Sequence, residues 1–104
     1  MYLIGAPVAL TVILDLHVKK ETLDSAPAML REILIGTRAF DGCLGVDVLI
    51  DVTDPLHFIL LERWASVEAD AAYRAWRAGP GASELGSLLT GIPLVSKFEI
   101  ADDI

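Results

Sequence analysis

A histidine and a carboxylate stand two residues apart in a segment that has the pattern of a β-strand. Side chains two residues apart in a strand point to the same face, so Asp15 and His17 are expected to be neighbours. A carboxylate beside an imidazole holds its tautomer and raises its basicity. This pair could therefore accept a proton from a bound molecule; otherwise it lies at a subunit interface or at the end of the strand. We predict His17 as a catalytic residue and Asp15 as a substrate-binding residue.

Aromatic side chains form a second group with possible chemistry. Trp64 ends a predicted strand, and Tyr73 and Trp76 share one face of a predicted helix, so a flat aromatic ligand could stack against them. The same spacing is also typical of an ordinary core. The Tyr73 hydroxyl is the feature that a core would not need, and it could donate to a ligand oxygen or reach water. We predict Tyr73 as a second catalytic residue, and Trp64, Trp76 and Phe58 as substrate-binding residues.

The remaining charged residues predict less. His57 begins a strand beside a turn and is expected to be solvated. Glu62 and Arg63 point to opposite faces of their strand, so each should meet a charge on a neighbouring strand or on another subunit. Asp70 and Arg74 have the spacing of an ordinary surface pair on a helix.

Metal and phosphate chemistry have no support in the sequence. Two isolated histidines and one cysteine do not form a ligand cluster, so no metal site is predicted. Cys43 has no evident base or cation beside it, which argues against a catalytic thiol. There is no glycine-rich phosphate-binding loop.

Hydrophobic patterning predicts the elements that must position these side chains. Pro27 favours a late start for the first helix, with Thr22 or Ser25 as its cap, and Ser66 is expected to cap the second. The predicted elements are a strand over 8–18, a helix ending near 38, strands over 46–51 and 57–65 joined by a turn at 53–55, a helix from 66 to a stop at 79–81, a short helical piece over 83–89 and a strand over 92–100.

This order is β-α-β-β-α-β, which is the ferredoxin-like α+β arrangement with a four-stranded antiparallel sheet. Right-handed crossovers place both helices on one face of the sheet and leave the other face bare. The strands are nevertheless apolar on both sides. Leaving a bare face of about 800 Å² in water would cost on the order of 20 kcal/mol, at roughly 25 cal/mol per Å². We therefore predict a homodimer formed through the sheet face.

The length and net charge of the chain indicate how many domains it forms and which classes of partner are disfavoured. The chain has 104 residues and is expected to form a single domain over 1–104. A net charge of −7 disfavours nucleic acid and membrane surfaces as partners. The uncharged N-terminal segment lacks the basic residues of a signal peptide and is too short to span a membrane, so it is predicted to be a buried strand. A single cysteine fits a reducing, cytoplasmic location.

Three short motifs follow one another along the chain. They are the turn Asp41-Gly42-Cys43-Leu44-Gly45, the hairpin Asp54-Pro55 followed by Leu61-Glu62-Arg63-Trp64, and the spacing of Tyr73, Trp76 and Arg77. In this order the motifs resemble the antibiotic biosynthesis monooxygenase family of dimeric α+β barrels. The resemblance spans about residues 8–100.

The resemblance implies a ligand pocket inside each subunit, between the sheet and its helices. Relatives include oxygenases that use neither metal nor flavin and act on anthrone- or quinol-like aromatics, and also haem-degrading enzymes. The haem-degrading relatives rely on an Asn, a Trp and a helical His. This chain has no Asn or Gln, and Tyr73 stands roughly where many relatives place that His, so the haem branch is disfavoured. The missing amide also weakens the match to the cofactorless oxygenases.

The resemblance therefore predicts a cofactor-independent monooxygenase that acts on an enolisable polycyclic or quinol-type aromatic. Such a substrate, once deprotonated, can itself reduce dioxygen, so the protein need only bind it, take the proton and stabilise the anion. Two alternatives stay open: a noncatalytic dimeric module that binds a hydrophobic small molecule, and an isomerase or cyclase on the same fold. A His17–Asp15 pair inside the pocket would favour an enzyme, and a purely apolar pocket would favour the binding module.

Overall fold

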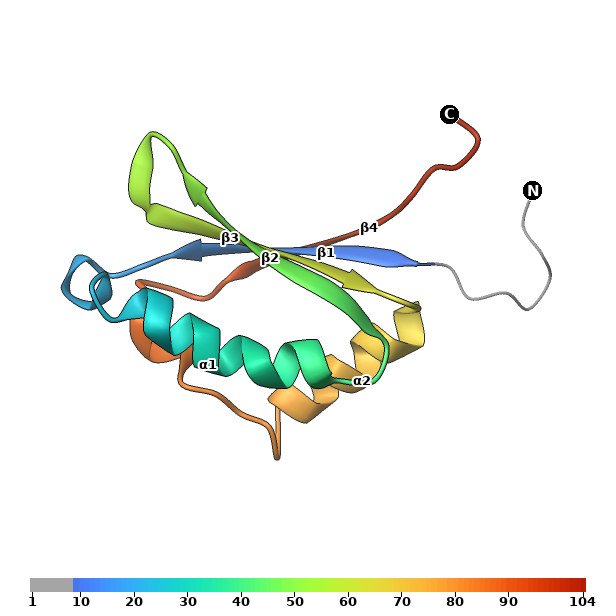
Figure 1. Cartoon of the computed structure of the whole chain (residues 1–104), viewed down its shortest axis with the longest axis horizontal. Coiled ribbons are helices and arrows are strands. Elements are labelled where there is room, and N and C mark those ends of the chain that lie inside the picture. The colour runs from blue at the N-terminus through green and yellow to red at the C-terminus, as the bar shows by residue number, and fades with distance from the viewer. Residues whose placement is uncertain (1–8) are drawn as a thin grey trace.

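The computed structural model describes residues 9–104 as one antiparallel sheet with two helices packed on one of its faces (Figure 1). The element order confirms the predicted ferredoxin-like α+β fold. The elements are β1 (Leu10–His17), η1 (Lys20–Thr22), α1 (Ala26–Ala39), β2 (Cys43–Asp51), β3 (Asp54–Trp64), α2 (Val67–Arg77), η2 (Leu85–Leu88) and β4 (Leu94–Glu99).

The strands are arranged in the order β2-β3-β1-β4, so β1 and β3 form the centre of the sheet. Their antiparallel register places Leu10 opposite Trp64 at one end and His17 opposite His57 at the other. Burial alternates along β1, because every second side chain packs under the helices. We call the side on which α1 and α2 pack the helix-covered face and the other side the open face.

The hydrophobic core lies between the helix-covered face and the two helices. The alternate β1 positions from Leu10 to Leu16 are all buried in it. On α1, the buried side chains are those of Ala26, Leu30, Leu34 and Thr37, which share one side of the helix. The core residues are Leu10, Val12, Leu14, Leu16, Val18, Ala26, Leu30, Leu34, Val46, Phe58, Leu60, Trp64, Tyr73, Leu88 and Leu89.

Among residues 9–104, no helix covers the open face (Figure 1). This face carries several large apolar side chains, and Phe98 on β4 keeps 53% of its surface exposed. By strand register, its apolar side chains are Ile13, Leu49, Ile59, Leu61, Leu94 and Phe98. Within the same described part of the chain, no helix is both long and apolar enough to cross a membrane.

The starts of β2 and β3 differ most from the predicted boundaries, each by three residues. The turn between these two strands is only two residues long, so β3 begins at Asp54 rather than near His57. The turn is held by Asp51, whose Oδ1 accepts hydrogen bonds from the backbone N and the hydroxyl of Thr53, both at 2.8 Å. β2 begins at Cys43, whereas the sequence predicted a start at Val46. The predicted start of the first strand, at Val8, lies outside the described residues.

The helix caps were predicted with mixed success. The Ser66 hydroxyl accepts from the backbone N of Ala69 at 3.1 Å, which confirms it as the cap of α2. Ser25 occupies the cap position of α1, but its hydroxyl donates to the carbonyl of Thr22 instead. Gly42 turns the chain into β2 with φ of +90°, and a Cβ there would lie 2.4 Å from the Cβ of Ala69. Only glycine fits this turn.

Candidate active site

A cavity of about 160 Å³ lies between the helix-covered face and the helices. Its sheet side comes from β1 and β3 and combines the apolar Leu14 and Leu60 with the carboxylate of Glu62, and α1 and α2 contribute further polar groups. The lining residues are Leu14, Ile33, Leu34, Thr37, Leu60, Glu62, Tyr73, Arg74, Arg77, Ser83 and Leu85. This mixture can hold an apolar molecule and direct its polar atoms.

Two hydroxyl groups meet in the cavity wall. The Tyr73 hydroxyl lies 2.7 Å from the hydroxyl of Thr37. Each oxygen also accepts a hydrogen bond from Arg77, through Nε at 2.8 Å for Tyr73 and through Nη2 at 2.9 Å for Thr37. The two hydroxyls carry one hydrogen each, and their mutual bond uses one of them. The other O–H remains available as a donor to a ligand oxygen.

Arg77 is itself fixed in place by backbone carbonyls. Its Nη2 donates to the carbonyl of Ile33 at 2.7 Å and its Nη1 to the carbonyl of Gly81 at 3.1 Å. These bonds tie α1 to the segment that follows α2. The guanidinium also lies over the rings of Tyr73 and Trp76. The hydroxyl pair therefore sits beside a positive charge whose position does not depend on a ligand.

A buried carboxylate forms the second polar group of the cavity. Glu62 is 1% exposed, and its Oε1 accepts from the indole Nε1 of Trp64 at 3.0 Å and from Arg74. Arg74 also donates to Asp70, which in turn accepts from Lys97 of β4. The predicted pair of Asp70 and Arg74 forms, with Nε of Arg74 3.0 Å from Oδ1 of Asp70. Its predicted position on the surface was wrong, because Asp70 is only 1% exposed. The helix spacing alone does not show that this side of α2 packs against the sheet.

The predicted substrate-binding aromatics do not line the cavity. Trp64 is fully buried and packs behind Tyr73, with ring centroids 4.7 Å apart. Trp76 is half-buried, and Phe58 lies deep in the core. Tyr73 is the one aromatic side chain among the lining residues. The tryptophans instead pack near the ring of Tyr73, and the ring centroid of Trp76 lies 6.1 Å from it.

A wider pocket of about 430 Å³ opens on the outer side of α1. It is lined by Ala28, Met29, Glu32, Ile33, Ser83 and Glu84. Ile33 and Ser83 belong to both linings, so the two spaces adjoin. We call this wider space the outer pocket.

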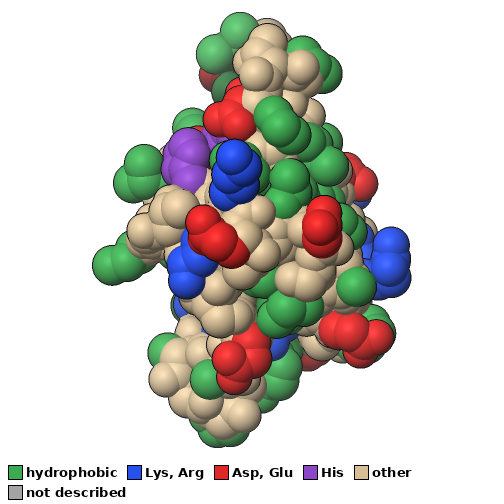
Figure 2. All heavy atoms as spheres, turned by 90° about the vertical axis from the view of Figure 1, so that its left-hand side faces the viewer, with side chains coloured by type: hydrophobic (Ala, Val, Ile, Leu, Met, Phe, Trp, Pro, Cys, Tyr) green, Lys and Arg blue, Asp and Glu red, His purple; other side chains and the backbone are tan. Residues whose placement is uncertain are grey.

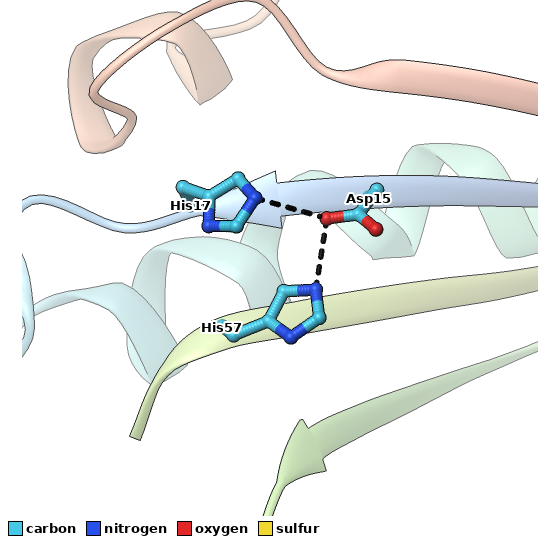
Figure 3. Close-up of side chains that lie close together, drawn as sticks. All are labelled: Asp15, His17 and His57. Atoms are coloured by element: carbon cyan, nitrogen blue, oxygen red, sulfur yellow. Dashed lines mark hydrogen bonds and ion pairs between the residues drawn. The ribbon is translucent and has the colours of Figure 1, made fainter. Parts of the chain in front are cut away.

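Asp15 and His17 lie on the open face, on the other side of the sheet from Tyr73. The structure thus divides the predicted site residues into two groups that the sheet separates. The His17–Asp15 pair is outside the cavity, so it does not provide the support for an enzyme that a pair inside the pocket would have given. Figure 3 shows the pair on β1, with His57 of β3 beside it.

His57 is more deeply engaged than the sequence predicted. Its Nε2 lies 2.8 Å from Oδ1 of Asp15, and its Nδ1 lies 2.9 Å from Oδ2 of Asp51. The bonds to Asp51 and Asp15 raise the pKa of His57 above its ordinary value of 6.5. Its bond to His57 and its bonds to Thr53 lower the pKa of Asp51.

Several residues of the cavity were missed in the sequence, although signals were present. Thr37 is a polar residue on the apolar stripe of α1, and such a position calls for a hydrogen-bond partner when buried. Arg77 follows Tyr73 by four residues, which places them side by side on a helix. Glu62 alternates with Leu60 and Trp64 on β3, so it must share their buried face.

Comparisons with known proteins agree with this fold. The family model for antibiotic biosynthesis monooxygenase matches residues 9–85. An antibiotic biosynthesis monooxygenase of known structure is 26% identical, with 88% of this chain and 97% of that chain covered and a TM-score of 0.72. Rv0793 from Mycobacterium tuberculosis is 25% identical, with coverage of 91% and 97% and a TM-score of 0.70. A conserved protein from Methanosarcina mazei Go1, at 15% identity, 89% and 93% coverage and a TM-score of 0.75, shares the fold. No curated protein matches the chain.

Proposed function

Because this chain belongs to the antibiotic biosynthesis monooxygenase family, we propose that it is a monooxygenase acting on an enolisable aromatic small molecule of the polycyclic or quinol type. The observation that carries the proposal is the hydroxyl pair of Tyr73 and Thr37 in the cavity wall, held by Arg77 with one O–H left to donate. An enolate oxygen is the kind of acceptor that such a group stabilises.

The available space supports a substrate with one reacting ring inside the cavity. A volume of about 160 Å³ is below the usual range of ligand pockets, which is roughly 300–1,000 Å³. The adjoining outer pocket adds about 430 Å³ of mostly apolar space. A polycyclic substrate would place its oxygenated ring beside Tyr73 and its remaining rings against Met29 and Ile33.

The proposed reaction needs no cofactor, because the substrate supplies the electrons. Loss of a proton from the carbon beside the carbonyl gives an enolate, which transfers electrons to dioxygen and forms a peroxide anion at that carbon. Return of the same proton from its acceptor converts this anion to a hydroperoxide. For a CH₂ group, loss of water from the hydroperoxide leaves a new carbonyl. One oxygen atom then stays in the product, and the other leaves as water.

Residues that line the cavity can be assigned to the proton transfer and to stabilisation of the anion. The free hydroxyl of the Tyr73–Thr37 pair donates to the enolate oxygen, and the charge of Arg77 stabilises the anion. Glu62 is the carboxylate among the lining residues, and we assign it the role of proton acceptor. His17, on the open face, has no part in this reaction. The polar lining favours catalysis over passive binding, because a site that only sequesters an apolar molecule gains nothing from buried charges.

We further propose that the open face forms a homodimer. Its exposed apolar side chains, Phe98 and Leu49 among them, would be covered by the same face of a second subunit. Two sheets packed in this way bury both apolar faces with one symmetric contact.

The test is dioxygen uptake by the purified protein with a panel of anthrones and dihydroxynaphthalenes. Uptake should rise with protein concentration and fall about 100-fold in Tyr73→Phe, because one donor to the anion is lost. Ser25→Ala is the control, since it removes an exposed hydroxyl outside the cavity. Absence of uptake by folded protein across the panel would contradict the oxygenase, and full activity of Tyr73→Phe would contradict the assignment of the cavity.

A further inference from the structure

The geometry points to a second site: we infer that Asp15, His17 and His57 bind a divalent transition-metal ion of the zinc type on the open face. This site is separate from the cavity, and the inference does not rest on the proposed oxygenase. It rests on how three ligand atoms converge, on a carboxylate that orients one of the histidines, and on the position of the cluster at the end of the sheet, where His17 stands opposite His57 at the last paired position of β1 and β3.

Two of the three separations between ligand atoms are already close to those around a metal ion. His17 and His57 stand directly opposite each other on β1 and β3, and their rings are stacked 4.9 Å apart and nearly parallel. Both Nε2 atoms face Oδ1 of Asp15, at 3.3 Å for His17 and 2.8 Å for His57 (Figure 3). All three ligand atoms lie within 4.8 Å of one another.

These separations can be compared with those around a metal. Two ligands with bonds of about 2.0–2.1 Å in tetrahedral geometry lie about 3.3 Å apart. The His17–Asp15 separation is already 3.3 Å, and the His57–Asp15 separation of 2.8 Å needs to lengthen by about 0.5 Å. The His17 side chain is 63% exposed, so its ring can turn toward a shared ion without disturbing the core.

Asp51 provides the orientation that metal-binding histidines require. Nδ1 of His57 lies 2.9 Å from Oδ2 of Asp51, so that its N–H donates to this carboxylate and Nε2 points toward Asp15. When a metal ion displaces the proton on Nε2, the lone pair of this nitrogen would face the ion. Asp51 is in turn held by two hydrogen bonds from Thr53 to its other oxygen. A carboxylate that holds the far nitrogen of a metal-bound imidazole is a recurrent feature of zinc sites. A simple ion pair between Asp15 and a histidine would need neither the second imidazole nor this support.

The donor set selects the kind of ion. Two imidazole nitrogens and one carboxylate oxygen suit zinc and its neighbours, whereas magnesium and calcium prefer oxygen ligands throughout. Three protein ligands leave at least one position open for water or another ligand. Histidine side chains reach the surface of the molecule at this end (Figure 2), and the net charge of −7 favours the approach of a cation.

The experiment is a titration of tag-free, chelator-treated protein with Zn²⁺. Calorimetry measures the binding, and NMR of the histidine side chains monitors the ligands. The chain has two histidines, so the imidazole signals can be assigned with one variant, His17→Ala. We expect one Zn²⁺ per chain and shifts of both imidazoles. His17→Ala should weaken binding by at least about 10-fold, and Asp51→Asn by about 10- to 100-fold.

Cys43→Ser is the matched control, because it removes the single thiol of the chain, which lies at the opposite end of the sheet, where Cys43 pairs with Trp64. It should bind Zn²⁺ as the wild type does. The inference is overturned if folded wild-type protein binds no Zn²⁺, if only one imidazole shifts, or if the loss of affinity appears in Cys43→Ser instead. The NMR result on the wild-type protein stands even if a variant fails to fold. None of these measurements uses enzymatic activity.

Discussion

Glu62 and Arg63 are consecutive residues of β3 whose side chains point to opposite faces of the sheet. Glu62 is 1% exposed and binds Arg74 under the helices. Arg63 is 47% exposed on the open face, where it pairs with Asp47 of β2 at 3.2 Å. Two adjacent residues therefore form a buried ion pair and an ordinary surface ion pair.

These two residues should differ sharply in what they contribute to stability. Glu62→Ala leaves Arg74 and the indole N–H of Trp64 without their buried partner, so we expect the free energy of unfolding to fall by about 3 kcal/mol. Arg63→Ala should cost about 0–1 kcal/mol, because an exposed pair contributes little. Urea unfolding of both variants checks this. Equal effects would show that the Glu62 network is not desolvated.

Gly81 should be intolerant of any side chain. A Cβ at this position would lie 2.2 Å from ring atoms of Trp76, so Gly81→Ala must displace the ring or the segment after α2. We expect a loss of about 1–3 kcal/mol in the free energy of unfolding. Gly86→Ala is the control, since a Cβ there meets no atom within 4 Å, and its effect should stay within about 0.5 kcal/mol. Thermal unfolding of the two variants measures the difference. Equal melting temperatures for Gly81→Ala and Gly86→Ala would contradict the close packing of Gly81 against Trp76.

The His57 network should make stability depend on pH in metal-free protein. Asp51 and Asp15 raise the pKa of His57, and His17 is the other titratable group beside it. A raised pKa means that the folded protein binds this proton more tightly than the unfolded chain does. The stabilisation is therefore complete below the ordinary pKa of 6.5 and is lost as the pH rises through the folded value.

The companion group behaves in the opposite sense. The pKa of Asp51 is lowered from its ordinary 3.8, so its contribution is present above that value and is lost as the pH falls through the folded value. Urea unfolding with a chelator at pH 5.5 and 8.5 should show a greater loss of stability at the higher pH in the wild type than in His57→Gln. An NMR titration should give a His57 pKa above 6.5 that falls in Asp51→Asn. A His57 pKa unchanged by Asp51→Asn would contradict the network.

A charge placed on the open face should separate the proposed dimer. Phe98 is 53% exposed there, and Phe98→Glu would bury a carboxylate in the contact between two sheets. We expect this variant to sediment as a monomer at concentrations where the wild type is a dimer. Val52→Glu is the control, since Val52 is fully exposed in the β-hairpin turn, away from the sheet. A wild-type chain that sediments as a monomer would contradict the dimer.

Much of the fold follows from local pattern. Alternation along β1, helical spacing on α1 and α2, and the breaks at Gly42 and Gly79 are properties of short segments, and short-range sterics decide them. The bare apolar face also followed, because the order of elements places both helices on one side. Even the opposed directions of Glu62 and Arg63 needed only the two-residue period of a strand.

The sites were decided by tertiary structure. Alternation says that Asp15 and His17 share a face, but not whether that face meets the helices, and strands that are apolar on both sides leave the choice open. Register between β1 and β3 brings His57 to His17 across 40 residues of chain, and no local pattern contains that register. The same holds for Thr37 and Tyr73, whose hydroxyls meet because α1 and α2 pack together. Sequence determined the elements and the character of their faces; packing determined which chemical groups share a site.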